Sequence, residues 1–303
     1  MGTGTHMSDA QQMTSVQRGG FHSPEQEWPD ATDEMRPRPD HGEQSYEGHQ
    51  RLKGLRALIT GGDSGIGRAV AIAFAREGAA GVAISYLPVE QQDAEETASW
   101  VQDAGATAVL VPGDLTDEDV CKRVVDVAVG ELGGLDILVN NAGFHLATGD
   151  AGTVQGLQPE TVHRVLNANF EAVLWVTQAA LPHLREGSAI INTSSIQSYE
   201  PSGHLLDYAA TKAAINSITV NLAEQLGPQG IRVNAVAPGP IGTPLQPATR
   251  EPEDLESFGS ETPLGRAGQP AEVAPAYVFL ASPRDASYVS GTILGVTGGR
   301  ATF

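Results

Sequence analysis

The sequence is short of cysteine, of positive charge and of long apolar runs. Its single cysteine, Cys121, excludes an internal disulfide framework and a metal site built from cysteines. The 18 Lys and Arg residues stand against 37 Asp and Glu, a formal net charge of −19 that repels nucleic-acid phosphates and anionic lipid surfaces. No run approaches the roughly 18 apolar residues of a membrane span, and no basic-then-apolar leader opens the chain. We therefore expect a cytoplasmic protein without a nucleic-acid or membrane partner.

Aliphatic residues are also scarce at the start of the chain. Residues 1–50 contain one Val, no Leu and no Ile, but four Pro, four His and nine acidic residues. Such a segment buries too little apolar surface to offset the entropy lost on ordering it. We expect an irregular extension over residues 1–52, with residues 1–7 derived from an expression vector. Its aromatic residues and prolines leave two alternatives open: a plain tail, or an arm packed on its own or a neighbouring subunit.

From residue 53 onward, short apolar runs alternate with amphipathic segments over about 250 residues. The runs lack polar alternation and read as strands buried on both faces. They are Leu55–Thr60, Val82–Tyr86, Ala108–Pro112, Leu135–Asn140, Ala189–Thr193, Ile231–Val236 and Thr292–Val296. Helices are expected at Gly65–Glu77, Gln91–Ala104, Asp117–Leu132, Pro159–Leu184 and Asp207–Leu226. This alternation predicts an α/β fold: one Rossmann-type, doubly wound parallel sheet of about seven strands with helices on both faces, in a single domain over residues 53–303.

Three glycines stand where the first predicted strand meets the first predicted helix. A dinucleotide pyrophosphate needs bare backbone N–H groups at a helix N-terminus. Gly61 permits a tight turn, Gly65 lets the backbone approach the phosphates, and Gly67 lets the helix lie close to the strand. The turn therefore predicts a nucleotide-binding site, to which Asp63, Ser64 and Ile66 also belong.

Tyr208 and Lys212 are four residues apart in a predicted helix, so the phenol and the ammonium share one helix face. Ser195 ends the fifth predicted strand, 13 positions before Tyr208. Asn is mildly unfavourable inside a helix, which suggests a functional reason for Asn169, with Asn167 as the rival choice. These side chains are candidates for one polar site.

Together the motifs resemble the short-chain dehydrogenase/reductase family. The Thr-Gly-x-x-x-Gly-x-Gly turn, the Asn140–Gly143 stretch, the strand-end Ser195 and Tyr208-x-x-x-Lys212 follow in the family's order. The resemblance covers residues 53–299 and is greatest to bacterial general-stress and aldehyde-reductase-like members. It implies an NAD(P)(H)-dependent oxidoreductase that transfers a hydride between the nicotinamide and a small alcohol, aldehyde or ketone. The alternatives are a catalytically silent nucleotide-binding or scaffold protein of the same fold, and a sugar-nucleotide epimerase or dehydratase, whose glycine spacing and large C-terminal domain this chain lacks.

The resemblance also implies a role for each matching residue. Ser195, Tyr208, Lys212 and Asn169 would be catalytic, with Asn169 holding a water that relays protons. The cofactor would contact Gly61, Asp63, Ser64, Gly65, Ile66, Gly67, Tyr86, Leu87, Asp114, Leu115, Asn141, Ala142, Gly143, Tyr208, Lys212, Pro238, Gly239, Ile241 and Thr243. The substrate pocket would include Phe144, His145, Gln197, Tyr199, His204 and Leu205. No metal site is predicted, because the histidines show no ligand spacing with carboxylates.

The expected chemistry depends on the acidity of Tyr208. A free tyrosine has a pKa near 10 and is too weak an acid to lose its proton readily at neutral pH. The Lys212 cation and the positive nicotinamide ring are expected to lower that pKa. Tyr208 would then give a proton to a carbonyl oxygen or take one from a hydroxyl, while Ser195 holds that oxygen.

The choice between NAD and NADP depends on the charges beside the adenosine ribose. The second predicted strand ends in Ser85-Tyr86-Leu87-Pro88, with neither the acid that binds a ribose 2′-hydroxyl nor the Arg that binds a 2′-phosphate. Asp63 would repel a 2′-phosphate, so NAD is favoured over NADP. The long connection over residues 240–268 is expected to be the substrate lid, as in the family.

A homotetramer is expected, with a homodimer as second choice, through the predicted helices Pro159–Leu184 and Asp207–Leu226. They contain more apolar residues than one sheet-facing stripe requires: Val173, Leu174, Trp175, Val176, Ile215, Ile218 and Val220. These residues therefore predict a further buried surface between subunits.

Overall fold

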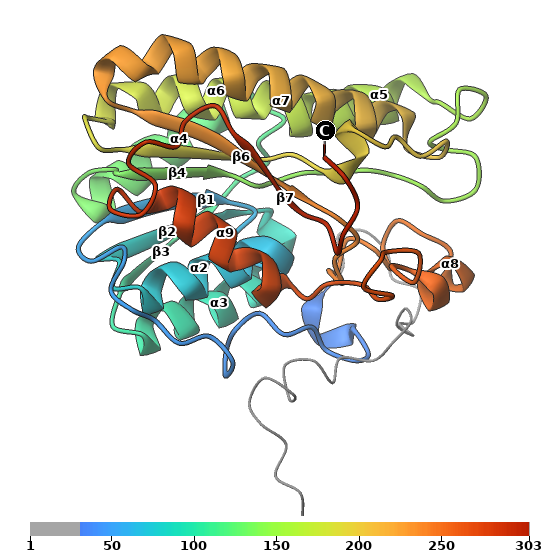
Figure 1. The fold of residues 1–303 in the computed structure, drawn as a ribbon, viewed down its shortest axis with the longest axis horizontal. Coiled ribbons are helices and arrows are strands. Elements are labelled where there is room, and N and C mark those ends of the chain that lie inside the picture. Colours follow the sequence, from blue (N-terminus) through green and yellow to red (C-terminus); the bar gives the residue numbers. More distant parts are fainter. Residues whose placement is uncertain (1–30, 303) are drawn as a thin grey trace, which may run out of the picture.

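A seven-stranded parallel sheet forms the centre of the computed structural model, which describes residues 31–302 (Figure 1). The strand order is β3-β2-β1-β4-β5-β6-β7, and every neighbouring pair is parallel. The strands are β1 Arg56–Thr60, β2 Gly81–Tyr86, β3 Thr107–Pro112, β4 Ile137–Asn140, β5 Ala189–Thr193, β6 Arg232–Pro238 and β7 Ile293–Val296. All seven predicted strands are present, and their ends lie within two residues of the predicted ones. The predicted fold class is confirmed.

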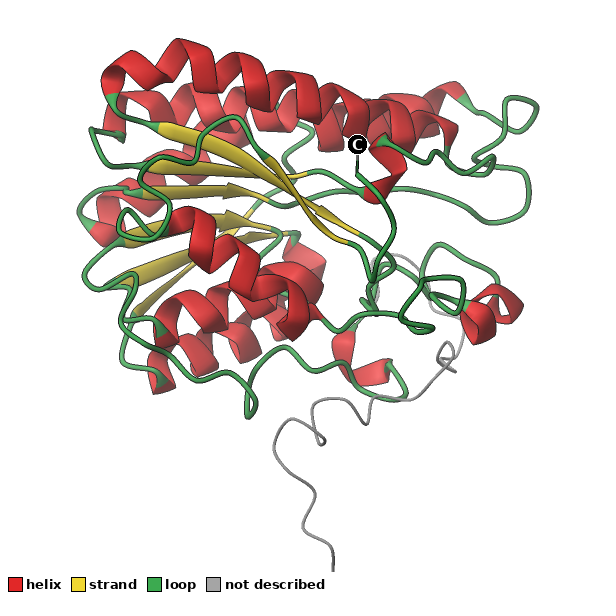
Figure 2. Ribbon diagram, in the orientation of Figure 1, coloured by secondary structure: helices red, strands yellow, loops and turns green. Residues whose placement is uncertain are grey.

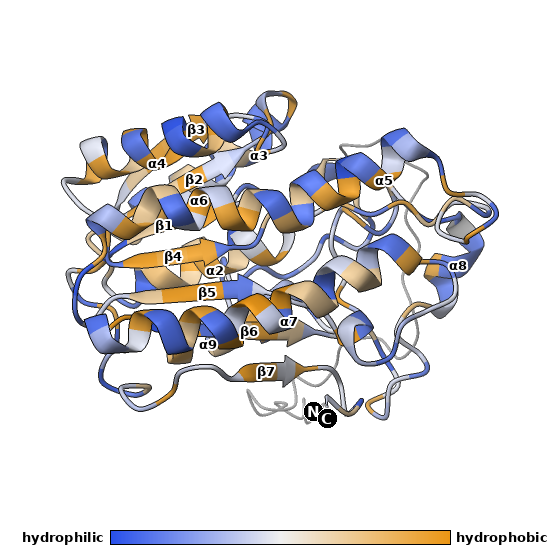
Figure 3. Ribbon diagram, turned by 90° about the horizontal axis from the view of Figure 1, so that it is seen from above, coloured by the Kyte–Doolittle hydropathy of each residue, from blue (hydrophilic) through white to orange (hydrophobic). Residues whose placement is uncertain are grey.

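Helices cover both faces of this sheet (Figure 2). One layer consists of α2 Gly65–Arg76, α3 Gln91–Asp103 and α9 Pro270–Ala281; the other of α4 Glu118–Leu132, α5 Pro159–Leu166, α6 Ala172–Ala180 and α7 Leu206–Leu226. Successive side chains of a strand point to opposite faces, so Ile59 joins the core under α2 and α9 while Leu58 joins the core under α4 and α6. Burial on both faces explains why the strands are continuously apolar, as the hydropathy colouring shows (Figure 3).

The helix predicted over Pro159–Leu184 is interrupted. Between α5 and α6 the residues Asn167–Glu171 form a π-helical segment, and the last residues, Leu181–His183, form a 3₁₀ turn. A π-helical turn inserts one residue into an α-helix and often occurs at a functional site. The predicted lid over residues 240–268 also contains a short helix, α8 Pro252–Ser257, which the sequence reasoning missed.

Residues 31–52 pack against the domain of their own chain. Met35 and Leu52 are fully buried, and the Tyr46 hydroxyl donates to Glu77 at the end of α2, at 2.7 Å. The described part of the extension is therefore an arm on its own subunit. The expectation for residues 1–7 lies outside the described residues.

The chain leaves the sheet in opposite directions from β1, which leads by α2 to β2, and from β4, which leads by α5 and α6 to β5. Beyond the carboxyl ends of β1 and β4 the connections therefore diverge, and such a point is where open α/β sheets bind ligands. No helix among residues 31–302 is long and apolar enough to cross a membrane.

Candidate active site

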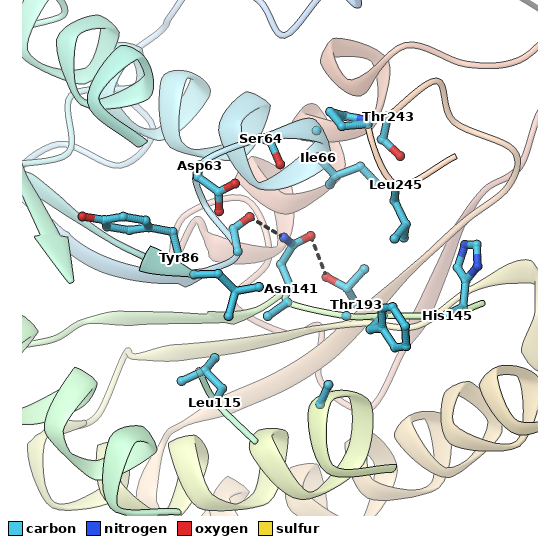
Figure 4. A pocket seen from close by; sticks show the side chains of 18 of the residues that line it. Asp63, Ser64, Ile66, Tyr86, Leu115, Asn141, His145, Thr193, Thr243 and Leu245 are labelled. Carbon is cyan, nitrogen blue, oxygen red and sulfur yellow. Dashed lines mark hydrogen bonds between the residues drawn. The ribbon is translucent and has the colours of Figure 1, made fainter. Parts of the chain in front are cut away.

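A single elongated cavity lies at the carboxyl ends of β1, β2, β4, β5 and β6 (Figure 4). Of the residues expected to contact the cofactor, all but one line it: Gly61, Asp63, Ser64, Gly65, Ile66, Tyr86, Leu87, Asp114, Leu115, Asn141, Ala142, Gly143, Tyr208, Lys212, Pro238, Gly239, Ile241 and Thr243. The exception, Gly67, lies behind the turn. Thus one cavity connects the glycine turn to the polar groups at the end of β5.

The glycine turn needs its glycines for two different reasons. Gly61 and Gly65 have positive φ angles of 60° and 48°, which other residues adopt with strain. A Cβ at Gly67 would lie 1.8 Å from the Gly61 carbonyl oxygen, so only glycine fits where α2 meets the turn. Ser64 makes no side-chain cap to α2, so the first N–H groups of this helix remain available for a phosphate. The turn therefore has the shape and the donors that a pyrophosphate requires.

Asn141 connects this turn to the end of β4. Its amide nitrogen donates to the Thr60 and Gly61 carbonyls at 3.1 and 2.9 Å, and its backbone N–H donates to the Thr60 hydroxyl at 2.9 Å. The Thr193 hydroxyl on β5 donates to its amide oxygen at 3.4 Å (Figure 4). Three strand ends are therefore fixed to one another around the cavity floor.

Ser195, Tyr208 and Lys212 meet at one end of the cavity. The Ser195 hydroxyl lies close enough to the Tyr208 phenol to lower its pKa, and the Lys212 ammonium lies 5.4 Å from the centre of the Tyr208 ring. Lys212 is almost fully buried and its Nζ donates to the Thr193 carbonyl at 2.9 Å. Burial lowers the pKa of Lys212 to about 8. The three groups predicted from separate motifs therefore form one cluster.

The expected effect of Lys212 on Tyr208 is not found in this structure. Burial raises the pKa of Tyr208 above 10, and the hydrogen bond from Ser195 and the positive charge of Arg250 oppose this shift only in part. Desolvation disfavours the phenolate, and the Lys212 ammonium, directed at the Thr193 carbonyl, does not reverse that. The predicted lowering, which also depends on the positive nicotinamide ring, stays a prediction.

Asn169, and not Asn167, lies in this cluster. It belongs to the π-helical segment and is fully buried. Its amide oxygen accepts from the Phe144 N–H at 2.7 Å, and its amide nitrogen donates to the Phe144 carbonyl at 2.8 Å and to the Thr211 hydroxyl at 3.2 Å. A Cβ on Gly143 would lie 3.4 Å from the Asn169 amide oxygen and 3.5 Å from the Lys212 Nζ. Asn169 therefore fixes the backbone beside Lys212.

Comparison with known proteins decides the family. A family model described as enoyl-(acyl carrier protein) reductase matches residues 61–301. The uncharacterized oxidoreductase YhxD of Bacillus subtilis is 50% identical over 301 residues, which cover 97% of this chain and 99% of that protein. A short-chain dehydrogenase from Burkholderia cenocepacia, solved in complex with NADP, is 36% identical with a TM-score of 0.76, over 82% of this chain and 98% of that one. The chain belongs to the short-chain dehydrogenase/reductase family.

Two plant members of this family have named activities. NADPH-dependent aldehyde reductase 1 of Arabidopsis thaliana is 45% identical over 88% of this chain and 92% of that protein. The glucose and ribitol dehydrogenase of Daucus carota is 46% identical over 88% of this chain and 91% of that protein. Like these relatives, the chain is an oxidoreductase with a nicotinamide cofactor.

Solved family members differ in their cofactor. A blue fluorescent protein from a metagenomic library, in complex with NADPH, has a TM-score of 0.76 and 33% identity, over 83% of this chain and 100% of that one. An NADH-dependent reductase responsible for alginate metabolism has a TM-score of 0.72 and 34% identity, over 84% of this chain and 100% of that one. The complexes with NADP and NADPH favour NADP, contrary to the expectation of NAD.

Of the six residues predicted for the substrate wall, two line the cavity. Phe144 and His145 line the cavity, and the His145 ring packs edge-on against Tyr208 with 5.1 Å between ring centres. The other four predicted residues, Gln197, Tyr199, His204 and Leu205, are not among the described residues that line it. The chain turns away after Ser195: the Gln197 side-chain oxygen accepts from the Ser202 N–H at 2.7 Å, and His204 is exposed.

His145 is unusual in this wall. It is 3% exposed, and its Nδ1 has no hydrogen-bond partner among the described residues. Burial, with the positive charges of Arg250 and Lys212, lowers the pKa of His145 to about 3. His145 is therefore a neutral imidazole next to the Tyr208 phenol.

Sequence reasoning missed residues that reach the site from elements it could not place. Leu245 and Gln246 of the lid line the cavity, as do Glu90 and Arg164. Arg250, also in the lid, contributes a positive charge that opposes the rise of the Tyr208 pKa, and its Nε donates to the Gln246 side-chain oxygen at 2.9 Å. No spacing in the sequence indicates which lid residue faces Tyr208, because that depends on how the lid folds back.

Proposed function

We propose that this chain reduces and oxidises small carbonyl and alcohol substrates with a nicotinamide cofactor, using Tyr208 as acid–base group. The observation that carries the proposal is that Ser195, Tyr208 and Lys212 line the same cavity that begins at the glycine turn. The glycine turn fits a dinucleotide, because a Cβ on Gly65 would come within 3.1 Å of Thr243 across the cavity. When bound, the cofactor would supply or accept the hydride.

The protein's own groups then handle the proton. In reduction the Tyr208 phenol gives its proton to the carbonyl oxygen, and the Ser195 hydroxyl donates a hydrogen bond to the same oxygen as its negative charge develops. The raised pKa of Tyr208 keeps this proton in place at neutral pH. The Lys212 Nζ donates one hydrogen bond to the Thr193 carbonyl and has two further N–H donors for the nicotinamide ribose. Asn169 keeps Phe144 and Gly143 in position beside Lys212, next to the expected proton relay.

The substrate class follows from the relatives and from the wall. The named relatives act on aldehydes or on glucose and ribitol. Here the neutral His145 and the amide of Gln246 line the cavity beside apolar Phe144 and Leu245. A small aldehyde, ketone or polyol, acted on at its CH–OH or carbonyl carbon, suits this mixture of groups.

Cofactor preference is a separate proposal. The complexes of solved neighbours favour NADP, but the residues that line the cavity after β1 and β2 include the acids Asp63 and Glu90 and, among those described, no cation. Burial raises the pKa of Asp63 to about 6, so it is charged at neutral pH and opposes a 2′-phosphate nearby. We propose that the chain uses NADPH, as these neighbours do, and that the charge of Asp63 reduces its preference for NADPH over NADH at neutral pH.

The Asp63→Asn variant tests this preference. Removing the negative charge should raise kcat/KM for NADPH relative to NADH by about tenfold at pH 7. In the unchanged protein the relative use of NADPH should rise as the pH falls through 6, because Asp63 becomes protonated, and Asp63→Asn should lose this part of the pH dependence. An unchanged ratio of the two kcat/KM values in Asp63→Asn would show that the Asp63 charge does not affect the choice of cofactor.

Assembly and location remain proposals. A homotetramer through the layer of α5, α6 and α7, with a homodimer as second choice, is supported by the exposed Leu166, Leu206 and Val220. A cytoplasmic location is supported by the acidic composition and the single cysteine.

Three variants test the reaction. Tyr208→Phe should lower turnover by 10²-fold or more at unchanged cofactor affinity, as expected for loss of general acid–base catalysis. Ser195→Ala should also lower turnover without loss of cofactor affinity, whereas Lys212→Ala should lower both. The measurement follows absorbance of the reduced cofactor over a panel of aldehydes, ketones and sugars. If Tyr208→Phe turned over a substrate with rate-limiting chemistry as fast as the wild type, the mechanism would be refuted. If the wild-type protein turned over no substrate of the panel, a catalytically silent nucleotide-binding protein would be favoured.

A further inference from the structure

The described part of the arm, residues 31–52, contacts two segments that lie behind the walls of the cofactor cavity. One contact leads to the glycine turn, and the other to the base of the lid. We propose that this arm is part of the dinucleotide site and that Thr32 and Arg38 are positioning residues for the glycine turn, although neither lines the cavity. The proposal rests on the proposed function only in that the cavity binds a nicotinamide dinucleotide.

The first contact is a chain of hydrogen bonds. The backbone N–H and the hydroxyl of Thr32 donate to Oδ2 of Asp93 at 3.0 and 3.1 Å. The other oxygen of the same carboxylate, Oδ1, accepts from Arg68 at 2.7 Å. The Nε of Arg68 then donates to the carbonyl of Asp63, in the glycine turn, at 2.9 Å. Two side chains, those of Asp93 and Arg68, thus connect Thr32 to the turn.

Burial makes this chain stiff. Thr32 and Arg68 are fully buried, and Asp93 is 6% exposed. A buried guanidinium is stable only while its hydrogen bonds and its counter-charges are in place, because desolvation of an unpaired charge is costly. Asp93 and Glu96 supply those charges, at 2.7 and 3.1 Å from Arg68. Arg38 of the arm binds Glu96 from its other side, so the arm also shares this second counter-charge.

The second contact reaches the base of the lid. The Asp40 N–H donates to the Gln269 side-chain oxygen, and the Asp40 carbonyl accepts from the Ala271 N–H, both at 2.9 Å. The preceding residue, Gly268, pairs with the stretch that follows β6, through hydrogen bonds of 2.9 Å with the Pro240 carbonyl and the Gly242 N–H. The arm therefore connects the start of α9 and the lid base to the α3 side of the glycine turn.

The consequence for binding follows from the order of the contacts. Without the Thr32 hydroxyl, Asp93 loses a donor, and the Asp93–Arg68 pair is free to change its geometry. The Asp63 carbonyl then keeps only the Thr97 hydroxyl, at 2.7 Å, as a fixed donor, and the turn more often takes positions in which its N–H groups do not converge on a phosphate. Cofactor affinity should fall, while the chemistry at Tyr208, at the other end of the cavity, should not change once the cofactor is bound.

The test compares two variants that each delete one hydroxyl from the arm. Thr32→Val removes a donor to Asp93, and Tyr46→Phe removes a donor to Glu77 at the opposite end of α2, away from the turn. Both should lower the melting temperature. Only Thr32→Val should raise the Kd for the reduced cofactor, by about three- to tenfold, as for a hydrogen bond to a charged group that is lost only in part. Turnover at saturating cofactor should stay the same, and Thr32→Ser should restore the wild-type Kd.

The Kd is measured by fluorescence titration of the full chain with the reduced cofactor, without any substrate. Arg38→Gln, at an exposed position, provides a second variant that should raise the Kd in the same direction even if Thr32→Val folds poorly. Equal Kd values for Thr32→Val, Arg38→Gln and Tyr46→Phe would overturn the proposal while leaving the proposed function intact. A wild-type protein that binds no dinucleotide would instead overturn the proposed function.

Discussion

At the scale of single residues, the acidity of Tyr208 depends on neighbours from three different elements. Ser195 comes from the end of β5, Lys212 from the next turn of α7, and Arg250 from the lid. Burial raises the pKa of Tyr208, and the Ser195 hydrogen bond and the Arg250 charge act in the opposite direction. A positive charge that lowers the pKa of Tyr208 therefore comes from Arg250 of the lid.

Arg250 provides a direct test of this tuning. Arg250→Gln removes a positive charge that favours the phenolate, so the pKa of Tyr208 should rise further. The rising limb of the pH profile for alcohol oxidation should then move to higher pH, and turnover at neutral pH should fall severalfold. Arg250→Lys should leave the limb near its wild-type position. The exposed Arg284→Gln serves as control, and an unshifted limb in Arg250→Gln would exclude a role of the lid charge.

At the scale of elements, two irregular segments, the π-helical segment and the arm, position groups around the site. In the π-helical segment between α5 and α6, Asn169 faces the backbone of Phe144. An uninterrupted α-helix over the predicted range would orient this side chain differently. The arm contains little regular structure and is held to the domain by buried side chains and hydrogen bonds. The largest group of hydrogen bonds between arm and domain surrounds Glu77, whose carboxylate accepts from Tyr46, His49 and Arg51.

Glu77 makes the stability of the arm dependent on pH. Burial alone would raise the pKa of Glu77, but the hydrogen bonds from Arg51, Tyr46 and His49 outweigh it and lower the pKa to about 2. A lowered pKa adds stability that is complete above the ordinary value of 4.5 and is lost as the pH falls toward 2. Glu77→Gln should therefore be less stable than wild type at pH 7 by about 1–3 kcal/mol, and the difference should shrink between pH 4.5 and 2.

Urea unfolding across this pH range measures the difference. The exposed Glu131→Gln on α4 is the matched control and should stay close to wild type throughout. A gap between wild type and Glu77→Gln that is the same at acid and neutral pH would show that the carboxylate charge is not what fixes the arm.

At the scale of the whole molecule, the helical layer of α5, α6 and α7 corrects part of the expected subunit interface. Val173, Val176 and Ile215, counted as surplus apolar residues, are buried inside the subunit. Val220, at 52% exposed, and Leu206, at 46%, remain uncovered on α7. The apolar surface available for assembly is therefore smaller than the sequence pattern suggested, and it lies on α7 rather than on α6.

This surface leads to a prediction for assembly. Light scattering at micromolar concentration should give a homotetramer, and Val220→Asp should lower the oligomeric order because it places a charge in an apolar contact. The Glu224→Gln variant, also on α7, serves as a control for expression and folding. A monomer at this concentration would rule the assembly out.

The sequence by itself determined the sheet, the glycine turn and the cluster of Ser195, Tyr208 and Lys212. These features depend on local rules: continuous apolar runs make buried strands, positive φ angles and close backbone contacts require Gly61 and Gly67, and a spacing of four puts Tyr208 and Lys212 on one helix face. Only the tertiary structure decided the direction of the Tyr208 pKa shift, the contribution of Arg250 and the attachment of the arm through Thr32, Asp93 and Arg68. These properties depend on burial and on contacts between segments far apart in the chain, and no spacing within one segment contains that information.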